Sequence, residues 1–203
     1  MDNQQKIWDE FGRSFGVTEF FGPRLEIRPS VLVAMLLTWV GVGLFAGLVL
    51  NYALNWAVLA GLAVVLIHWS SLLYHHLGHH RAAAKTSFSL QAIDFWWWLA
   101  TDLYYVSPDE VPVRVHMKRA LGGPFASLSF SLLWGVAALF LYFIIGDFFY
   151  LAIFGWFLNL FGFTLLALVP FKLFGRESDG YTLRKYRQGA AGARALDYVE
   201  KND

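Results

Sequence analysis

Four uncharged apolar stretches dominate the sequence and restrict the folds that it can adopt. The first holds about 20 residues without a charge, which is enough for one helix to cross the hydrocarbon core of a bilayer. The approximate bounds of the four stretches are 31–50, 56–80, 124–145 and 148–170. Every backbone polar group must be satisfied within the hydrocarbon region, and a helix does this inside a single segment. The sequence therefore predicts an all-α integral membrane protein with four transmembrane helices.

The composition is that of a membrane protein. Of 203 residues, 57% are hydrophobic and only 15% are charged, which is typical of a chain that lies mostly in a lipid bilayer. The formal net charge of +1 gives no overall attraction for nucleic acid, so we expect no nucleic-acid partner. The chain has no cysteine, which excludes disulfide bonds and thiolate ligands. A metal site would therefore need histidine and carboxylate ligands.

The distribution of charges predicts how the chain crosses the membrane. With four spans, all 16 lysine and arginine residues lie on one side, and Asp147 is the only charge on the other side. The positive-inside rule then places both termini in the cytoplasm, as in a multi-pass protein of a cell inner membrane. We expect a cytoplasmic interfacial segment, a four-helix membrane domain and a cytoplasmic tail, at residues 1–29, 30–187 and 188–203.

Residues 88–106, between the second and third spans, are apolar but contain two aspartates. If residues 88–106 crossed the membrane, the basic residues that follow would be moved to the opposite side, against the charge pattern. We therefore expect a re-entrant or interfacial segment here. Its three consecutive tryptophans, Trp96, Trp97 and Trp98, are expected to contact lipid, a partner protein or a substrate.

A cluster of histidines stands at the cytoplasmic end of the second span. His75 and His79 are four residues apart, so they share one face of a helix at the spacing that holds a zinc ion. His68 lies seven residues before His75, on the same face. The hydrolytic zinc motif is H-E-x-x-H, in which the glutamate is the general base. Here that position holds His76, which becomes the candidate general base.

Two histidines need at least one further protein ligand to form a catalytic zinc site. Asp179 follows the fourth span, on the side where the second span ends, so the two helix ends can meet. The flexible Gly180 beside it allows a sharp turn. Other carboxylates remain open as alternatives, namely Asp94, Asp102 and Glu177.

Three motifs together resemble the site-2 protease family of intramembrane zinc metalloproteases. Residues 75–79 stand in the place of the family's H-E-x-x-H. Residues 120–128, Ala-Leu-Gly-Gly-Pro-Phe-Ala-Ser-Leu, are similar to the family's A-G-P-x-x-N/S-L. Residues 159–170 with 178–180 are similar to its N-x-x-P…D-G segment. The resemblance covers about residues 55–187.

The resemblance implies a site and a substrate. His75, His79 and Asp179 would be the zinc ligands, and Asn159 would lie near the backbone of the substrate. In the family, a strand-like loop after the zinc helix positions the unwound substrate helix, and residues 82–112 occupy that place. A transmembrane helix would then be the substrate.

Two departures from the family pattern weaken the expectation of activity. His76 replaces the glutamate, and loss of a general base typically lowers the rate by about 10²–10⁴-fold. The 82–112 segment carries three tryptophans where the family usually has a glycine-rich strand pair. We therefore predict a zinc-binding but catalytically impaired homologue, a pseudoprotease that binds membrane helices or serves as a subunit.

Three alternatives remain open. In the first, the protein is an active intramembrane zinc metalloprotease, because an imidazole with an ordinary pKa of about 6.5 can accept a proton. In the second, it is a structural subunit of a larger membrane complex, with the histidines as a polar cap and Asp179 as a turn residue. In the third, it binds haem or a chlorin through His68 as axial ligand, although no paired histidine on another span supports this.

Overall fold

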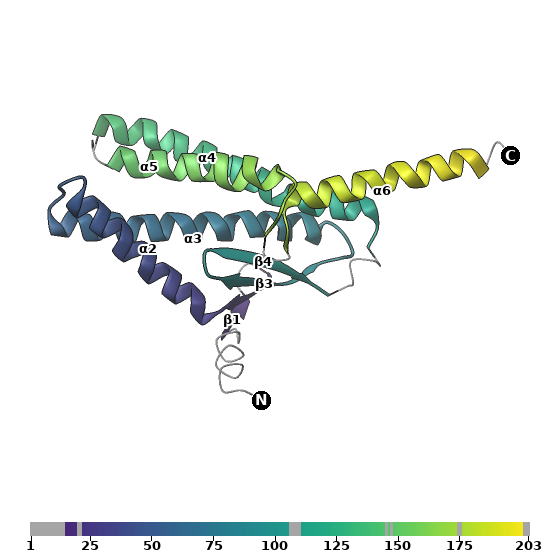
Figure 1. The fold of residues 1–203 in the computed structure, drawn as a ribbon, viewed down its shortest axis with the longest axis horizontal. Helices are drawn as coiled ribbons and strands as arrows, with labels where there is room; N and C mark the ends of the chain where they lie inside the picture. The colour runs from purple at the N-terminus through teal and green to yellow at the C-terminus, as the bar shows by residue number, and fades with distance from the viewer. Residues whose placement is uncertain are drawn as a thin grey trace.

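Four long helices form the membrane domain of the computed structural model, which describes residues 15–19, 22–105, 111–144, 146, 148–173 and 176–200 (Figure 1). The helices are Pro29–Leu48 (α2), Leu54–Ala84 (α3), Val113–Ile144 (α4) and Phe148–Phe157 (α5), the last continued by the π-helix Leu158–Leu166 (η2). Within the described residues, four helices are long and apolar enough to cross a membrane, which confirms the prediction. The last residues of α2 and α4 and the first residues of α3 and α5 lie at the same end of the helices (Figure 1).

The surfaces of the helices suit a lipid environment. Large apolar side chains point outward, and Leu132 and Phe143 of α4 are 65% and 83% exposed. Small residues face the neighbouring helices instead. Gly78 of α3 and Gly122 of α4 lie so close that a Cβ on either would collide with the carbonyl oxygen of the other. Because this crossing has no side chain between the backbones, α3 and α4 pack closely beside the histidine cluster.

Helix α4 begins well before the predicted start of the third span at residue 124. It starts at Val113 and contains Pro124 in its interior. A proline inside a membrane helix removes one backbone hydrogen bond, and neighbouring helices make this tolerable. The earlier start matters for the site, because it places Arg119 and Gly123 on a helix that packs against α3.

The segment between α3 and α4 contains a β-hairpin, in the place where the resemblance implied a strand-like loop. Whether this segment is re-entrant or interfacial stays a prediction. The strands are Phe15–Glu19 (β1), Arg24–Ile27 (β2), Leu90–Trp96 (β3) and Leu99–Tyr104 (β4). They form one sheet in the order β1-β2-β3-β4, with β2 and β3 parallel and the other pairs antiparallel. The predicted interfacial N-terminal segment thus contributes two strands to the sheet, while residues 1–14, 20 and 21 lie outside the described residues. Its position relative to the bilayer stays a prediction.

The tip of this hairpin is fastened to α2 and α3. The Trp97 backbone N–H donates to Ser30 Oγ at 3.2 Å, and Trp98 Nε1 donates to Thr38 Oγ1 at 2.8 Å. From α3, His68 Nε2 lies 3.1 Å from the Trp98 carbonyl oxygen. The buried core between sheet and helices includes Leu25, Val31, Val65, Trp69, Leu72 and Ile93. The hairpin is therefore held at its tip and along one face.

An ion pair joins the start of α2 to β3, and its loss is expected to destabilise the protein. Arg28 Nε and Nη2 donate to the two Asp94 oxygens at 2.9 and 2.6 Å. The Asp94 side chain is only 3% exposed, so Arg28→Met would leave a buried carboxylate without this partner. Because Arg28 itself is 33% exposed, we expect a loss of about 3 kcal/mol, the low end for a broken buried pair.

Thermal unfolding in detergent measures this effect, with Arg24→Met as the matched control. Arg24 is 58% exposed and lies 3.6 Å from Glu26, so the same substitution there should change stability by less than about 1 kcal/mol. Equal effects of the two variants would show that the Arg28–Asp94 pair does not anchor the sheet.

The chain after η2 returns toward α3 through a short hairpin and enters a last helix. The hairpin strands are Lys172–Leu173 (β5) and Arg176–Glu177 (β6), and the helix is Asp179–Glu200 (α6). Helix α6 begins against the end of η2, where a Cβ on Gly180 would collide with the Leu168 carbonyl. It then packs on α4 and runs on beyond the other helices (Figure 1). The predicted tail, residues 188–203, thus continues α6 as far as Glu200.

Candidate metal centre

The structure brings together the three residues that the sequence singled out as metal ligands. His75 and His79 lie one turn apart on α3, with their Nε2 atoms 3.1 Å from each other. Asp179, at the start of α6, places Oδ2 3.3 Å from His75 Nε2 and Oδ1 3.5 Å from His79 Nε2. Both imidazoles are buried. These three side chains form a group that could hold a metal ion.

The geometry of this group suits zinc. Ligand atoms about 2.0 Å from a tetrahedral zinc lie about 3.3 Å from one another, close to the separations found here. Space for an ion is provided by Gly123 of α4, where a Cβ would stand 2.5 Å from His75 Nε2. Two imidazoles and one carboxylate are also the ligand set of catalytic zinc sites, which keep one position open.

The other ring nitrogen of each histidine has a partner that orients it. His75 Nδ1 lies 2.9 Å from Ser127 Oγ, and His79 Nδ1 lies 2.7 Å from the Arg119 carbonyl oxygen. A carbonyl can only accept, so Nδ1 of His79 carries a hydrogen, and Nε2 is the atom that would face a metal ion. Such partners fix the tautomer of a metal ligand.

Asp179 is ionised in this setting. Burial alone would raise the pKa of its carboxyl group, but the charge of His79 and hydrogen bonds with His75 and His79 outweigh burial, so the pKa lies well below its ordinary value. Its place in the first turn of α6 also favours the negative charge, because helix N-termini carry a partial positive charge. The carboxylate is therefore in the form that binds a metal.

The alternative carboxylates have other partners. Asp94 binds Arg28, and Glu177 Oε1 lies 3.0 Å from Lys172 Nζ. Asp102 Oδ1 lies 2.8 Å from His76 Nδ1, across the gap between β4 and α3. Of the four candidates, Asp179 is thus the one that approaches both His75 and His79 within 3.5 Å.

His76 points toward the hairpin and belongs to a second group of residues. Burial alone would raise the pKa of Asp102, but the charges of His76 and His79 outweigh it and the pKa is lowered. Tyr104 lies two residues along β4, and burial together with the Asp102 charge raises the pKa of its hydroxyl group. A second set of three side chains also lies close enough to hold a metal, namely His76, His79 and Asp102. Because His79 belongs to both sets, it could not serve both at once. Sequence reasoning missed the His76–Asp102 contact, although Asp102 and Tyr104 share one face of a strand.

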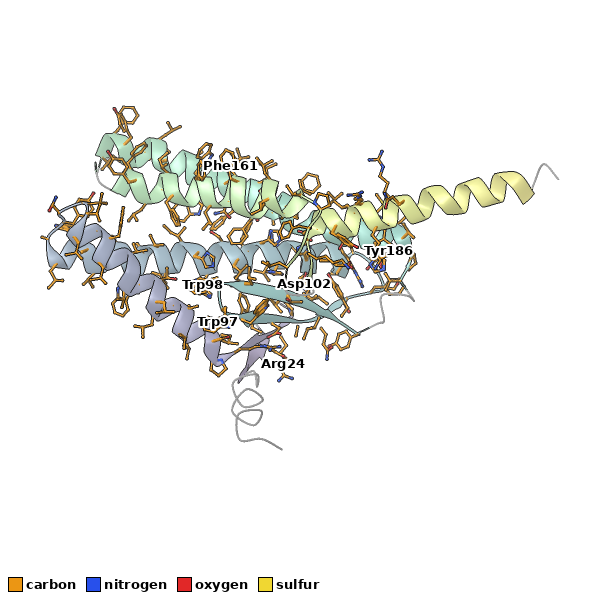
Figure 2. All side chains as sticks on the ribbon, viewed as in Figure 1. Arg24, Trp97, Trp98, Asp102, Phe161 and Tyr186 are labelled. Atoms are coloured by element: carbon orange, nitrogen blue, oxygen red, sulfur yellow. The ribbon has the colours of Figure 1, made fainter. Side chains whose placement is uncertain are left out.

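A cavity of about 870 Å³ lies beside these residues. Its apolar wall is formed by side chains from α3, β4 and η2, among them Leu72, Leu99, Phe163 and Leu166. Its polar end includes the four residues His75, His76, Asp102 and Asp179. Figure 2 shows Asp102 and Trp98 on the hairpin and Tyr186 on α6, three residues that line this cavity. An apolar chain could therefore lie against the metal group.

The other residues that the sequence analysis singled out lie in different positions relative to the cavity. Trp96 and Trp98 line the cavity, whereas Trp97, at the hairpin tip, is not among its lining residues. Asn159 is fully buried, and its Nδ2 donates to Ser71 Oγ at 2.8 Å, so it joins η2 to α3. His68 lines the apolar part and binds the Trp98 carbonyl.

Comparisons with known proteins bear on the fold of the chain. No protein-family model matches the chain. No curated protein matches it either. Among solved structures, it is similar to a site-2 protease from Methanocaldococcus jannaschii, with a TM-score of 0.54 and 16% sequence identity. The similarity covers 87% of this chain and 72% of that one. The protein is therefore an integral membrane protein with a site-2 protease-like fold.

Proposed function

We propose that the protein is a zinc-dependent intramembrane peptidase that cleaves an apolar membrane segment. The observation that carries the proposal is the convergence of His75, His79 and Asp179 at the wall of an apolar cavity. The site-2 protease-like fold supports the same function. Because His75 and His79 lie on a helix that is long and apolar enough to cross a membrane, the substrate in this proposal is a transmembrane helix. The predicted cytoplasmic orientation of the histidines is part of this proposal.

The side chains suggest which residue would perform each part of the reaction. Zinc held by the three ligands would polarise the scissile carbonyl and activate a water molecule. His76 lines the same cavity and stands at the general-base position of the motif. Its Nδ1 is engaged by Asp102, so Nε2 is the atom that accepts a proton from water and later returns it to the leaving amine.

A second candidate function is a zinc-binding homologue without useful activity, which binds membrane helices or serves as a subunit. The imidazole at position 76 favours it, because the family pattern has a carboxylate there. In that case the natural chain would bind zinc but would not cleave a membrane helix.

Cleavage assays in lipid vesicles separate the two functions. The purified protein is loaded with zinc and mixed with fluorescent synthetic single-span helices that carry helix-weakening residues near the centre. We expect cleavage by the natural chain, and a loss of about 10²–10⁴-fold in His76→Ala at unchanged zinc content. His80→Ala, a change at a half-buried histidine of the same helix, is the control and should retain activity.

If the natural chain does not cleave the synthetic helices, a His76→Glu variant shows the reason. If the natural chain is inactive but His76→Glu cleaves, the impaired homologue is correct and hydrolysis was lost at this position. If neither cleaves although both bind zinc, the fold serves binding alone.

A further inference from the structure

Asp102 contacts His76 from a different part of the chain. Its Oδ1 lies 2.8 Å from His76 Nδ1, and the two side chains are 12% and 10% exposed. We propose that Asp102 is a positioning residue, which holds His76 in the orientation and tautomer that proton transfer at the zinc site requires. This inference rests on the proposed peptidase function and adds the β3–β4 hairpin to its machinery.

The contact determines which nitrogen of His76 is free. A carboxylate oxygen only accepts hydrogen bonds, so Nδ1 must carry the hydrogen and donate it to Asp102. Nε2 of the neutral ring is then left with a lone pair. His76 lines the cavity and is the neighbour of the ligand His75 in sequence, with ring centroids 5.3 Å apart. Nε2 is therefore the ring nitrogen of His76 that would transfer the proton in the proposed reaction.

Asp102 is itself held in place by its neighbours. Tyr104 follows two residues later on the same strand. The Arg119 guanidinium lies 3.9 Å from the centre of the Tyr104 ring, and its Nη2 donates to the Phe88 carbonyl at 2.5 Å. Asp102 also pairs with Ile93 in the antiparallel register of the hairpin. The carboxylate therefore sits on a strand whose position is fixed from α4 as well as from α2 and α3.

This arrangement compensates for the missing glutamate in a specific way. In H-E-x-x-H, one carboxylate on the zinc helix performs the proton transfer. Here the helix supplies an imidazole and the hairpin supplies the carboxylate behind it. Removal of a carboxylate that orients a metal-binding histidine commonly changes metal affinity or activity by about 10–100-fold, and we expect a loss of activity of the same order here.

Kinetic variants distinguish positioning from a general structural role. We expect Asp102→Asn to lower kcat about 10–100-fold, with KM and zinc content unchanged. In a His76→Glu background, Asp102→Asn should have an effect of less than about twofold, because the histidine on which it acts is gone. Glu26→Gln, which likewise replaces a carboxylate with an amide but lies in strand β2, is the matched control and should leave kcat unchanged. Equal losses in both backgrounds, or loss of zinc in Asp102→Asn, would overturn the proposal.

The tautomer of His76 gives a readout that does not depend on activity. In ¹⁵N-histidine NMR spectra of the full-length protein in micelles, the His76 signals are those that disappear in His76→Gln. We expect the Nδ1–H tautomer in the natural chain and in Glu26→Gln, and its loss in Asp102→Ala. An Nε2–H tautomer in the natural chain would contradict this inference even if the protein cleaves. An inactive protein with the Nδ1–H tautomer would instead contradict the peptidase function while keeping the contact.

Discussion

Replacing His79 with alanine is expected to empty the zinc site. His79 Nε2 lies within 3.5 Å of both other ligands, so its removal leaves one imidazole and one carboxylate. Loss of an orienting partner alone lowers metal affinity by about 10–100-fold, and loss of a ligand should exceed that. Elemental analysis of the purified protein should show about one zinc per chain in the natural sequence and almost none in His79→Ala.

The neighbouring histidine provides the control for this measurement. His80 is on the same helix but belongs to neither metal group, so His80→Ala should keep its zinc. If His79→Ala binds zinc as tightly as the natural chain, the metal is held elsewhere and the assignment of His75, His79 and Asp179 is wrong. A strong visible absorption band in the same sample would point to a pigment or haem instead.

Adding one methyl group at Gly123 is expected to weaken zinc binding without changing any ligand. The Cβ of Gly123→Ala would lie 2.5 Å from His75 Nε2 and would also collide with the His79 ring. Both imidazoles must then move, and the separations that suit a tetrahedral ion are lost. We expect zinc affinity to fall at least about tenfold, with a decrease in stability of about 1–3 kcal/mol from overpacking.

Competition with a zinc chelator measures the affinity, and Gly41→Ala is the matched control. Gly41 lies in α2, and apart from the adjoining backbone of that helix no atom lies within 4 Å of the position of its Cβ, so the added methyl group makes no close contact. Unchanged zinc affinity in Gly123→Ala would show that the ion does not lie between the two imidazoles and α4. A loss of affinity in both variants would indicate a general effect on folding.

The membrane helices could be predicted from the sequence because their signal is local. A stretch of about 20 residues without charge can only be accommodated in lipid or in a large core, and the four stretches coincide with four helices. The position of His75 and His79 on one face of the helix could be predicted equally well, because residues four apart share a helix face. Asp179 was reached through its place at the end of the last span.

The sheet could not be predicted from the local pattern of residues, and only the resemblance implied a strand-like loop at residues 82–112. Residues 88–106 contain two short apolar runs, which periodicity cannot distinguish from a buried helical segment. What makes them strands is the pairing of β3 with β2, a partner more than 60 residues earlier in the chain, and with β4. Similarly, the buried position of Asn159 depends on Ser71, 88 residues away.

The sequence by itself determined the four spans and the pair of histidines on one helix face. It also determined that position 76 holds a histidine and not the glutamate of the motif. Only the tertiary structure decided which acid serves which histidine. Asp94 is taken by Arg28, Asp102 reaches His76, and Asp179 reaches both His75 and His79. The physical reason is that a carboxylate has the same local sequence signature whether it pairs with arginine, orients an imidazole or binds a metal. Its role depends on the groups that folding brings within about 3 Å of it.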